Sequence, residues 1–337
     1  MIQPTPRLYF YSAQQYDRAF FDQANAAHGF ELAYTESPLN ADTARLARGA
    51  SVICAFVNDI LDADCLRALA EAGVRTVALR CAGFNHVDLG EAKRLGLAVV
   101  SVPAYSPEAV AEHTLALILT LNRNTHRAYA RVREGDFNLK GLLGFNLNGR
   151  TVGLIGTGRI GVATARVLSG LGVELLGHDV HENPEFKALG GRYVALDELY
   201  ARSHIISLHC PLTESNHYMI NAESIARMRD GVMLVNTSRG GLIDTEAVIA
   251  ALKSRKVGHL ALDVYEQESD VFFRDLSDEI LADDMLSRLL TFPNVLITGH
   301  QGFFTQEAMT QIAEITLGNV AAVARGEACD NELTQRL

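Results

Sequence analysis

The sequence has 337 residues, of which 48% are hydrophobic and 21% are charged, and its formal net charge is −10. This length allows two domains with a substantial core. The acidic balance argues against a nucleic-acid partner, because a phosphate backbone selects for clustered lysine and arginine.

The cysteines and the apolar segments exclude further classes of protein. The five cysteines are scattered and no two form a CxxC pair, so we expect neither a metal site nor a disulfide framework, in keeping with a reducing cytoplasm. The N-terminus lacks the long apolar stretch of a signal peptide. The most apolar helix, around residues 115–121, is too short and too charged at its flanks to span a bilayer, so we expect no membrane partner.

Short apolar strands alternate with predicted helices from Arg7 to Pro103. This alternation is typical of a parallel sheet that is covered on both faces. Pro103 and residues 104–107 interrupt the pattern and predict a domain boundary. The strands are expected over 8–11, 30–34, 51–57, 76–80 and 97–102, and the helices over 14–28, 41–48, 62–72 and 88–95.

A long helix is predicted over residues 106–122. Ser106 is a candidate N-cap, Pro107 takes the first helical position, and Glu108 lies near the positive end of the helix dipole. Residues 123–149 are irregular and mixed in charge, and they are either a simple connector or a subunit contact.

A second alternating series follows, and it ends in one long helix over residues 306–325 that we expect to return to the first domain. Its strands are predicted over 151–156, 173–178, 204–208, 232–236, 259–263 and 295–298. The fold class is therefore α/β, with two doubly wound parallel-sheet domains. Chemistry in such folds sits at the carboxyl ends of the strands, and nearly every predicted strand here ends in a polar or charged residue.

The stretch TVGLIGTGRIG, residues 151–161, predicts a dinucleotide site between a strand and a helix. Gly156 permits the tight turn, Gly158 lets the backbone approach a pyrophosphate, and Gly161 lets helix and strand pack closely. The helix then directs its unpaired N–H groups at the phosphates. Asp179, about twenty residues on, can bind a ribose diol and would repel a 2′-phosphate, which favours NAD over NADP.

Two side chains at strand ends are candidates for chemistry. Arg239 follows strand 232–236, and its guanidinium offers a fork of donors that suits a substrate carboxylate. The alternative is a surface arginine. His300 follows strand 295–298 and can give a proton to a carbonyl oxygen near neutral pH, although a lone histidine is more often structural.

Acidic and sulfur-bearing residues follow two other strands. Glu266 and Glu268 could support a histidine, because a nearby carboxylate stabilises an imidazolium, or they could belong to a solvated acidic loop. Asp263, at the strand end, is the acid expected to meet a bound cofactor. Cys210 and Pro211 are interpreted as a turn that lines a cofactor, in preference to a metal or thiol site.

With GTGRIG, HCPLT, NTSRGGLID, ALDVYEQE and NVLITGHQGFFT in order, the sequence resembles the D-isomer-specific 2-hydroxyacid dehydrogenases, and among them most the fermentative D-lactate dehydrogenases. The resemblance covers nearly the whole chain. It implies a Rossmann NAD-binding domain over residues 104–300 and a flavodoxin-like substrate domain over residues 1–103 and 301–337. It also implies a homodimer or homotetramer joined through the cofactor domain, with the 106–149 segment as a plausible contact.

The resemblance assigns roles to individual residues. Arg239 matches the arginine that binds the substrate and polarises its carbonyl, His300 matches the catalytic histidine, and Glu268 matches the acid that pairs with it. Gly302 stands where close relatives usually have alanine. The implied NAD contacts are Gly158, Arg159 and Ile160 at the phosphates, Asp179 at the ribose, and Cys210, Pro211, Thr237, Ser238 and Asp263 near the nicotinamide. Gly156 and Gly161 complete the cofactor-binding loop through their roles in the turn and in packing. The implied substrate contacts are the backbone near Ala82 and Gly83, the Tyr105 hydroxyl and Arg239.

The implied activity is the reversible reduction of pyruvate to D-lactate by NADH, with His300 as the proton donor and no metal. One alternative is another 2-oxo acid, such as glyoxylate, hydroxypyruvate or a longer acid, since Tyr105, Phe303 and Phe304 are expected near the pocket. A second alternative is an NAD-sensing binding protein built on this fold, as in transcriptional corepressors. The complete set of Arg239, Glu268 and His300 favours the enzyme.

Overall fold

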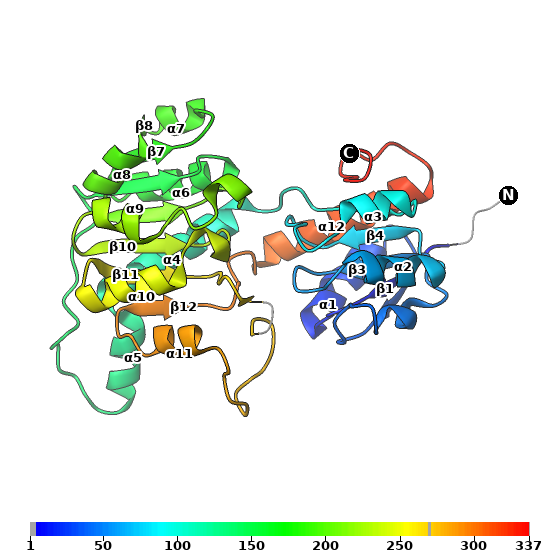
Figure 1. Ribbon diagram of the computed structural model, residues 1–337, viewed down its shortest axis with the longest axis horizontal. Helices are drawn as coiled ribbons and strands as arrows, with labels where there is room; N and C mark the ends of the chain where they lie inside the picture. Colours follow the sequence, from blue (N-terminus) through cyan, green and yellow to red (C-terminus); the bar gives the residue numbers. More distant parts are fainter. Residues whose placement is uncertain (1–4, 269–270, 337) are drawn as a thin grey trace. The chain divides into compact units, whose positions relative to one another are not determined.

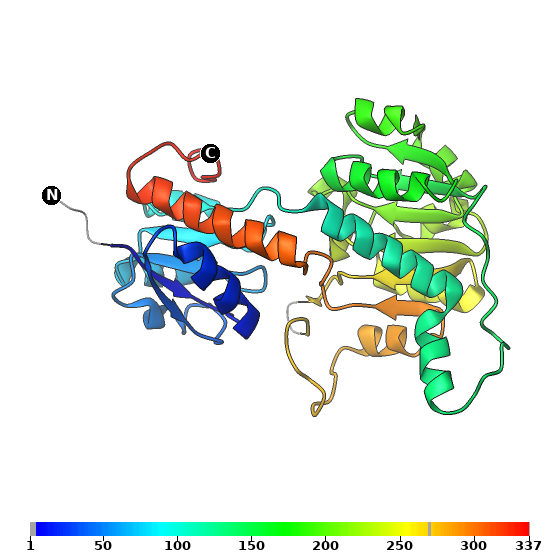
Figure 2. The same ribbon diagram turned by 180° about the vertical axis from the view of Figure 1, so that it is seen from behind.

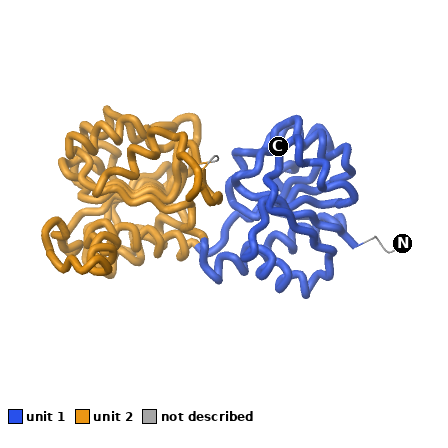
Figure 3. Tube along the Cα trace, turned by 90° about the horizontal axis from the view of Figure 1, so that it is seen from below, with its two compact units in different colours: residues 1–106, 304–337 blue, residues 107–303 orange. Residues whose placement is uncertain are grey.

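The computed structural model describes residues 5–268 and 271–336 (Figure 1). The chain divides into two compact units, unit 1 with residues 1–106 and 304–337, and unit 2 with residues 107–303 (Figure 3). Each junction lies three residues beyond the boundary expected from the sequence. The first junction lies after residue 106 because the first helix of unit 2 begins at Pro107.

Unit 1 is built on a five-stranded sheet with the order β2-β1-β3-β4-β5, and all of its strand pairs are parallel. This is the flavodoxin-like order. Figure 1 shows α2 and α3 over one face of the sheet, and Figure 2 shows α1 and α12 over the other. The elements are β1 Arg7–Phe10, α1 Gln15–Asn25, β2 Glu31–Tyr34, η1 Ala44–Ala47, β3 Val52–Ala55, α2 Ala63–Glu71, β4 Thr76–Leu79, α3 Leu89–Arg94, β5 Ala98–Val100 and α12 Gln306–Ala324.

Unit 2 is built on a seven-stranded parallel sheet with the order β12-β11-β10-β9-β6-β7-β8. Counted from β6, this is the 3-2-1-4-5-6 Rossmann order with one further strand. The strands are β6 Thr151–Ile155, β7 Glu174–His178, β8 Arg192–Tyr193, β9 Ile205–Leu208, β10 Val232–Asn236, β11 Val257–Leu262 and β12 Val295–Ile297. The helices are α4 Pro107–Arg123, α5 Thr125–Arg133, α6 Arg159–Ser169, α7 Pro184–Ala188, α8 Leu196–Arg202, η2 Glu214–Asn216, α9 Ala222–Arg227, η3 Gly240–Leu242, α10 Thr245–Ser254 and α11 Asp284–Leu290.

The core of unit 2 lies on both faces of its sheet. In β10, Met233 and Val235 pack with α4 and α6, whereas Val232 and Leu234 pack on the other side with α8 to α11. Successive side chains of a strand point to opposite faces, so a strand buried on both faces is apolar throughout. The predicted pair of doubly wound parallel sheets is thus confirmed, as is the return of the last helix, because α12 packs on α1, β4 and β5.

Three local predictions were wrong or incomplete. The helix expected over residues 41–48 is only the 3-10 turn η1, because the side chains of Asn40 and Thr43 take local backbone hydrogen bonds. The segment 123–149, expected to be irregular, contains α5, which the left-handed Asn124 (φ 51°) separates from α4. The two-residue edge strand β8 was not predicted.

Candidate functional site

The central strand β6 lies between β7 and β9, and the chain order reverses there. Ligands of open α/β sheets bind at such a switch point, outside the carboxyl ends of the strands. The predicted site residues of unit 2 follow the ends of β6, β7, β9, β10, β11 and β12. The sheet therefore brings these segments to one edge.

The three glycines after β6 have different surroundings. Gly156 has a φ of 94°, and a β-carbon there would lie 2.5 Å from the backbone of His209 and Cys210. A β-carbon on Gly161 would lie 2.1 Å from the carbonyl oxygen of Gly156. At Gly158, the N-cap of α6, a β-carbon would meet nothing within 4 Å. The loop is thus a packed turn with open space in front of a helix N-terminus, which fits a pyrophosphate.

Asp179 follows β7 and is held by the glycine loop. Its carboxylate accepts hydrogen bonds from the backbone and hydroxyl of Thr157 and from the backbone of His181. Burial alone would raise the pKa of this carboxyl, but these hydrogen bonds outweigh it, so the net pKa lies below the ordinary value. A fixed, ionised carboxylate at this point suits a ribose diol and opposes a 2′-phosphate.

The segment after β9 packs under the glycine loop. His209 donates its backbone N–H to the Ile155 carbonyl at 2.7 Å, and the Cys210 carbonyl accepts from the Ser238 hydroxyl at 2.7 Å. Burial raises the pKa of the Cys210 thiol to about 11. A protonated thiol is a poor nucleophile and a poor metal ligand, which argues against a thiol or metal site at Cys210.

The His209 ring predicts a pH dependence of stability. Nδ1 of the ring is shielded from solvent and has no hydrogen-bond partner in the described chain, and burial lowers the pKa to about 4 from 6.5. Between pH 6.5 and 4 the unfolded chain binds more protons at this site, so stability falls as pH falls through that window, by at most about 1.4 kcal/mol per pH unit. Urea unfolding at pH 7, 6 and 5 should show a smaller decline in His209→Asn than in the wild type. The control is His28→Gln, whose stability should decline with pH as that of the wild type does. An equal decline in His209→Asn and the wild type would exclude a contribution of His209.

The segment after β10 carries Arg239. The Thr237 hydroxyl lies 2.9 Å from that of Thr114 on α4, and Arg239 Nη1 donates to the Ser238 carbonyl at 2.7 Å. A β-carbon on Gly240 would lie 2.1 Å from the backbone of Tyr265. Glycine therefore lets this segment pack directly on the segment after β11, so that the half-buried Arg239 stands next to it.

Glu268 and His300 form an ion-pair contact. Oε1 of Glu268 lies 2.9 Å from Nδ1 of His300, and Oε2 accepts the backbone N–H of Tyr265 at 3.0 Å. The two side chains remain partly accessible, at 17% for His300 and 23% for Glu268. His300 has a φ of 54°, a left-handed conformation that is uncommon outside glycine and is found at functional sites. With Nδ1 on the carboxylate, Nε2 is the ring nitrogen left for a substrate.

Asp263 holds the turn that contains His300. Its side chain is nearly fully buried. The carboxylate oxygen Oδ1 accepts hydrogen bonds from the Thr298 hydroxyl, from the Gln301 backbone N–H at 2.9 Å and from His113 Nε2 at 3.1 Å. The other oxygen, Oδ2, accepts the Gly302 backbone N–H at 2.8 Å. A β-carbon at Gly302 would lie 3.0 Å from Oδ2, so glycine leaves the carboxylate room. Burial raises the pKa of Asp263, but the hydrogen bonds from His113 and Thr298 outweigh it and the net pKa is lowered.

The sequence did not single out His113 or Thr298 as parts of this site. His113 lies on α4, and Thr298 lies directly after β12. A histidine in a long apolar helix is the one signal that could have identified His113 as a buried, partnered group.

Asp263→Asn should lower kcat by roughly 10- to 100-fold, because the amide presents an N–H donor where the carboxylate accepts only, which costs about 1–3 kcal/mol in the turn that carries His300. Steady-state kinetics and urea unfolding of the same preparations measure both effects. Asp275→Asn, in an exposed loop, is the control. Wild-type turnover in Asp263→Asn would show that the turn does not depend on the carboxylate.

The substrate residues expected in unit 1 lie on a supported loop. Ala82 and Gly83, half-buried, follow β4 and Arg80, whose buried guanidinium forms an ion pair with Asp17 at 3.4 Å and donates to the Ser12 carbonyl at 2.9 Å. A buried charge without such partners would be strongly destabilising. The interior of unit 1 therefore holds the end of β4, where the loop with Ala82 and Gly83 begins.

The aromatic residues expected near the pocket have different surroundings. Tyr105 is half-buried in unit 1. Phe304 begins the second segment of unit 1, and its ring packs edge-on against Tyr16 with the centroids 4.7 Å apart. Phe303 is buried at the end of unit 2.

No cluster of three or more histidine, cysteine or acidic side chains that could hold a metal ion occurs in residues 5–268 and 271–336. None of the helices in this part of the chain combines the length and apolar character that a membrane span requires.

Comparison with known proteins gives matches over nearly the full length. Residues 115–302 match the family model of the D-isomer specific 2-hydroxyacid dehydrogenase, NAD binding domain. The chain is 54% identical to a 2-hydroxyacid dehydrogenase homolog of Haemophilus influenzae, over 96% of this chain and 98% of that protein. It is 50% identical to D-lactate dehydrogenase of Escherichia coli, over 97% of this chain and 99% of that protein.

Solved structures give the same result. The apo-structure of the Escherichia coli D-lactate dehydrogenase matches with a TM-score of 0.90 at 48% identity. The match covers 97% of this chain and 99% of the chain in that structure. The structure described as the pyruvate reductase of Chlamydomonas reinhardtii has a TM-score of 0.93 at 45% identity, with coverages of 97% and 98%.

Proposed function

Because this chain belongs to the D-isomer specific 2-hydroxyacid dehydrogenases, we propose that it reduces pyruvate to D-lactate with NADH in a reversible reaction. The enzyme class and the NAD cofactor follow from the family. The choice of pyruvate is supported by the names of two relatives, the D-lactate dehydrogenase of Escherichia coli and the pyruvate reductase of Chlamydomonas reinhardtii.

The observation that carries the proposal is the contact between Glu268 and His300, 2.9 Å long, in the unit that also presents Arg239. In the proposed reaction, Nδ1–H of His300 donates to Glu268, and Nε2–H gives its proton to the carbonyl oxygen of the substrate. The carboxylate stabilises the imidazolium before the transfer, and solvent returns a proton to the ring afterwards.

Arg239 binds the substrate carboxylate and polarises the carbonyl oxygen with its fork of N–H donors. The backbone N–H groups at Ala82 and Gly83 and the hydroxyl of Tyr105 bind the same carboxylate. When bound, the nicotinamide supplies the hydride that the carbonyl carbon receives. Arginine and imidazolium together stabilise the negative charge that develops on oxygen, so the reaction needs no metal.

Unit 2 is proposed to hold the cofactor and unit 1 to bind the substrate, in line with the match of residues 115–302 to an NAD binding domain. The open space at Gly158 and the ionised carboxylate of Asp179 support pyrophosphate and ribose sites there. The proposed contacts are Gly156, Gly158, Arg159, Ile160 and Gly161 at the phosphates, Asp179 at the ribose, and Cys210, Pro211, Thr237, Ser238 and Asp263 at the nicotinamide half.

A panel of 2-oxo acids of increasing size tests the substrate. The loss of NADH absorbance gives kcat/KM for glyoxylate, pyruvate, hydroxypyruvate and longer acids, and the proposal expects the maximum at pyruvate. A maximum at another acid would replace pyruvate within the same chemistry. No oxidation of NADH with any of the acids would favour an NAD-sensing protein.

We propose that the enzyme is a homodimer or homotetramer that acts in the cytoplasm. The five cysteines are free thiols, which supports a reducing compartment. The segment from α5 onward exposes large apolar side chains, with Phe137 at 75%, Leu139 at 80% and Leu143 at 95%. Exposed apolar groups gathered in one segment are typical of a protein interface.

The variant Phe137→Asp/Leu143→Asp should therefore have a lower molar mass in sedimentation equilibrium than the wild type, because two charges would be buried in the contact. Val180→Asp, which changes another highly exposed apolar residue, is the control. An unchanged mass in Phe137→Asp/Leu143→Asp would remove this segment from the interface.

A further inference from the structure

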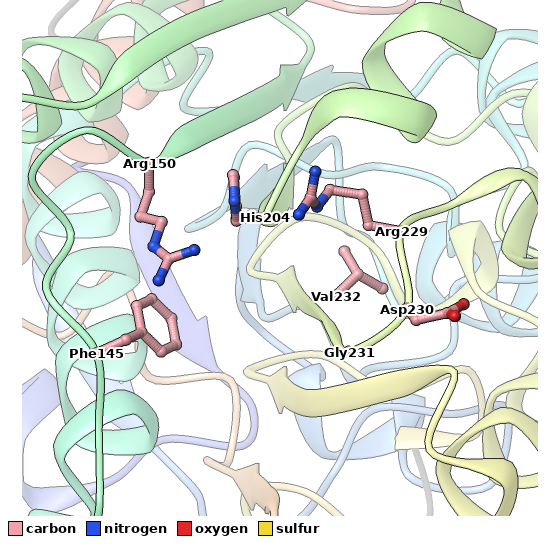
Figure 4. Close-up of a pocket in the computed structure, with 7 residues that line it drawn as sticks. All are labelled: Phe145, Arg150, His204, Arg229, Asp230, Gly231 and Val232. Carbon is pink, nitrogen blue, oxygen red and sulfur yellow. The ribbon is translucent and has the colours of Figure 1, made fainter.

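A pocket of about 190 Å³ lies in unit 2 at the amino ends of three neighbouring strands (Figure 4). Arg150 directly precedes β6, His204 directly precedes β9, and Arg229 lies just before β10. The cofactor loop and the catalytic candidates follow the opposite, carboxyl ends of the sheet. At about 3.3 Å per residue, the five residues of β6 separate the two edges by roughly 16 Å, so an occupant of this pocket is distinct from the cofactor.

The two arginines of the pocket have no acidic partner in the described chain. Other arginines of unit 2 do have partners, as in the ion pairs of Arg166 with Glu185 and of Arg227 with Asp197 and Glu223. Arg150 instead lies 5.3 Å from the centroid of the Phe145 ring. In a chain with a net charge of −10, two unpaired guanidinium groups at one pocket form a local positive region.

The acid in the pocket wall does not neutralise this region. Asp230 Oδ1 binds Lys256 Nζ at 2.8 Å, and Figure 4 shows its carboxylate directed away from both arginines. The same view shows the guanidinium of Arg229 directed toward His204. The pocket therefore keeps its positive charge.

His204 adds a hydrogen-bond donor. Its Nδ1 accepts the backbone N–H of Thr151 at 3.2 Å, so the proton of the neutral ring is on Nε2. Burial lowers the pKa of His204, and the charges of Arg229 and Arg150 lower it further, against smaller opposing effects of the Thr151 backbone and of Glu174. Both guanidinium groups thus act electrostatically on this ring, and an anion between them would relieve the repulsion.

We propose that this pocket binds a small oxyanion with at least two negative charges, of the class of a phosphate group or a compact dicarboxylate. Arg150 and Arg229 supply charge-assisted N–H donors, and His204 supplies a third donor. The volume equals roughly six water molecules at about 30 Å³ each, which suits an ion of this size and excludes a dinucleotide. The bound ion would link the segments that precede three central strands of unit 2.

Isothermal titration calorimetry of the enzyme saturated with NADH tests the site, with sodium phosphate and succinate as separate probes in buffers matched for ionic strength with chloride. NADH fills the cofactor site, so phosphate cannot report on it. We expect saturable binding of one ion per chain for at least one probe, and the stronger probe identifies the class. Arg150→Gln and Arg229→Gln should each weaken binding at least about tenfold, since each removes a charge-assisted contact.

Arg227→Gln is the matched control, because it removes a surface arginine two residues away that lies outside the pocket and already has acidic partners. It should bind the probe as the wild type does. Unchanged NADH affinity in each variant shows that unit 2 remains folded. Absence of saturable binding with both probes, equal affinity in wild type and pocket variants, or an equal loss in Arg227→Gln would each overturn the proposal.

Discussion

His300→Gln should retain NADH binding and lose about 10²- to 10⁴-fold in kcat, the usual contribution of a general acid. Glutamine can occupy the volume of the ring and can accept or donate a hydrogen bond, but it cannot give up a proton at neutral pH. The contact of His300 with Glu268 supports this assignment. Fluorescence titration measures NADH affinity, and the initial rate of NADH oxidation with saturating pyruvate measures kcat.

The histidine control is His28→Gln, which replaces a ring that stacks on Phe30 in unit 1 and should leave kcat unchanged. Full turnover in His300→Gln, with NADH binding intact, would remove the proton-donor role. A loss of NADH affinity equal to the loss of kcat would instead assign His300 to cofactor binding.

Arg239→Lys should lower kcat/KM for pyruvate by roughly 10²- to 10³-fold, or about 3–4 kcal/mol, although the charge is kept. Lysine offers a point charge, whereas the planar guanidinium can contact the carboxylate and the carbonyl oxygen together. The expected loss is therefore shared between KM and kcat. Packing of Gly240 on the backbone of Tyr265 fixes the segment that presents the guanidinium, so a flexible ammonium cannot recover its geometry.

Steady-state kinetics over a wide range of pyruvate concentrations separate the two parameters. Arg255→Lys, an exposed arginine at the end of α10, is the control and should be neutral. A wild-type kcat/KM in Arg239→Lys would show that charge alone is sufficient, and the forked contact would be withdrawn.

The strands could be predicted from the sequence because each is an apolar run buried on both faces. Residues 151–155 and 232–236 are buried throughout, and tertiary packing agrees there with the local preference. The order of elements then places the ends of these strands at one edge, which is why Arg239 and His300 could be named as candidates before their surroundings were known. The choice of Glu268 depended on the resemblance to the family, because its position alone also fitted a solvated acidic loop.

The remaining features depend on contacts between distant residues. Nothing next to His113 in the sequence indicates that its ring contacts Asp263, 150 positions later. The turn that contains the left-handed His300 is held by hydrogen bonds from Gln301 and Gly302 to Asp263, which follows the neighbouring strand β11 but lies almost forty positions earlier in the sequence. β8 has only two residues, which are too few to show a periodic pattern of apolar and polar side chains.

The most direct test of the proposed reaction is chiral analysis of the product formed from pyruvate and NADH by the purified protein. The account predicts one D-lactate for each NADH oxidised, with no detectable L-lactate. Formation of L-lactate, or no NADH oxidation with pyruvate or any other 2-oxo acid, would contradict it.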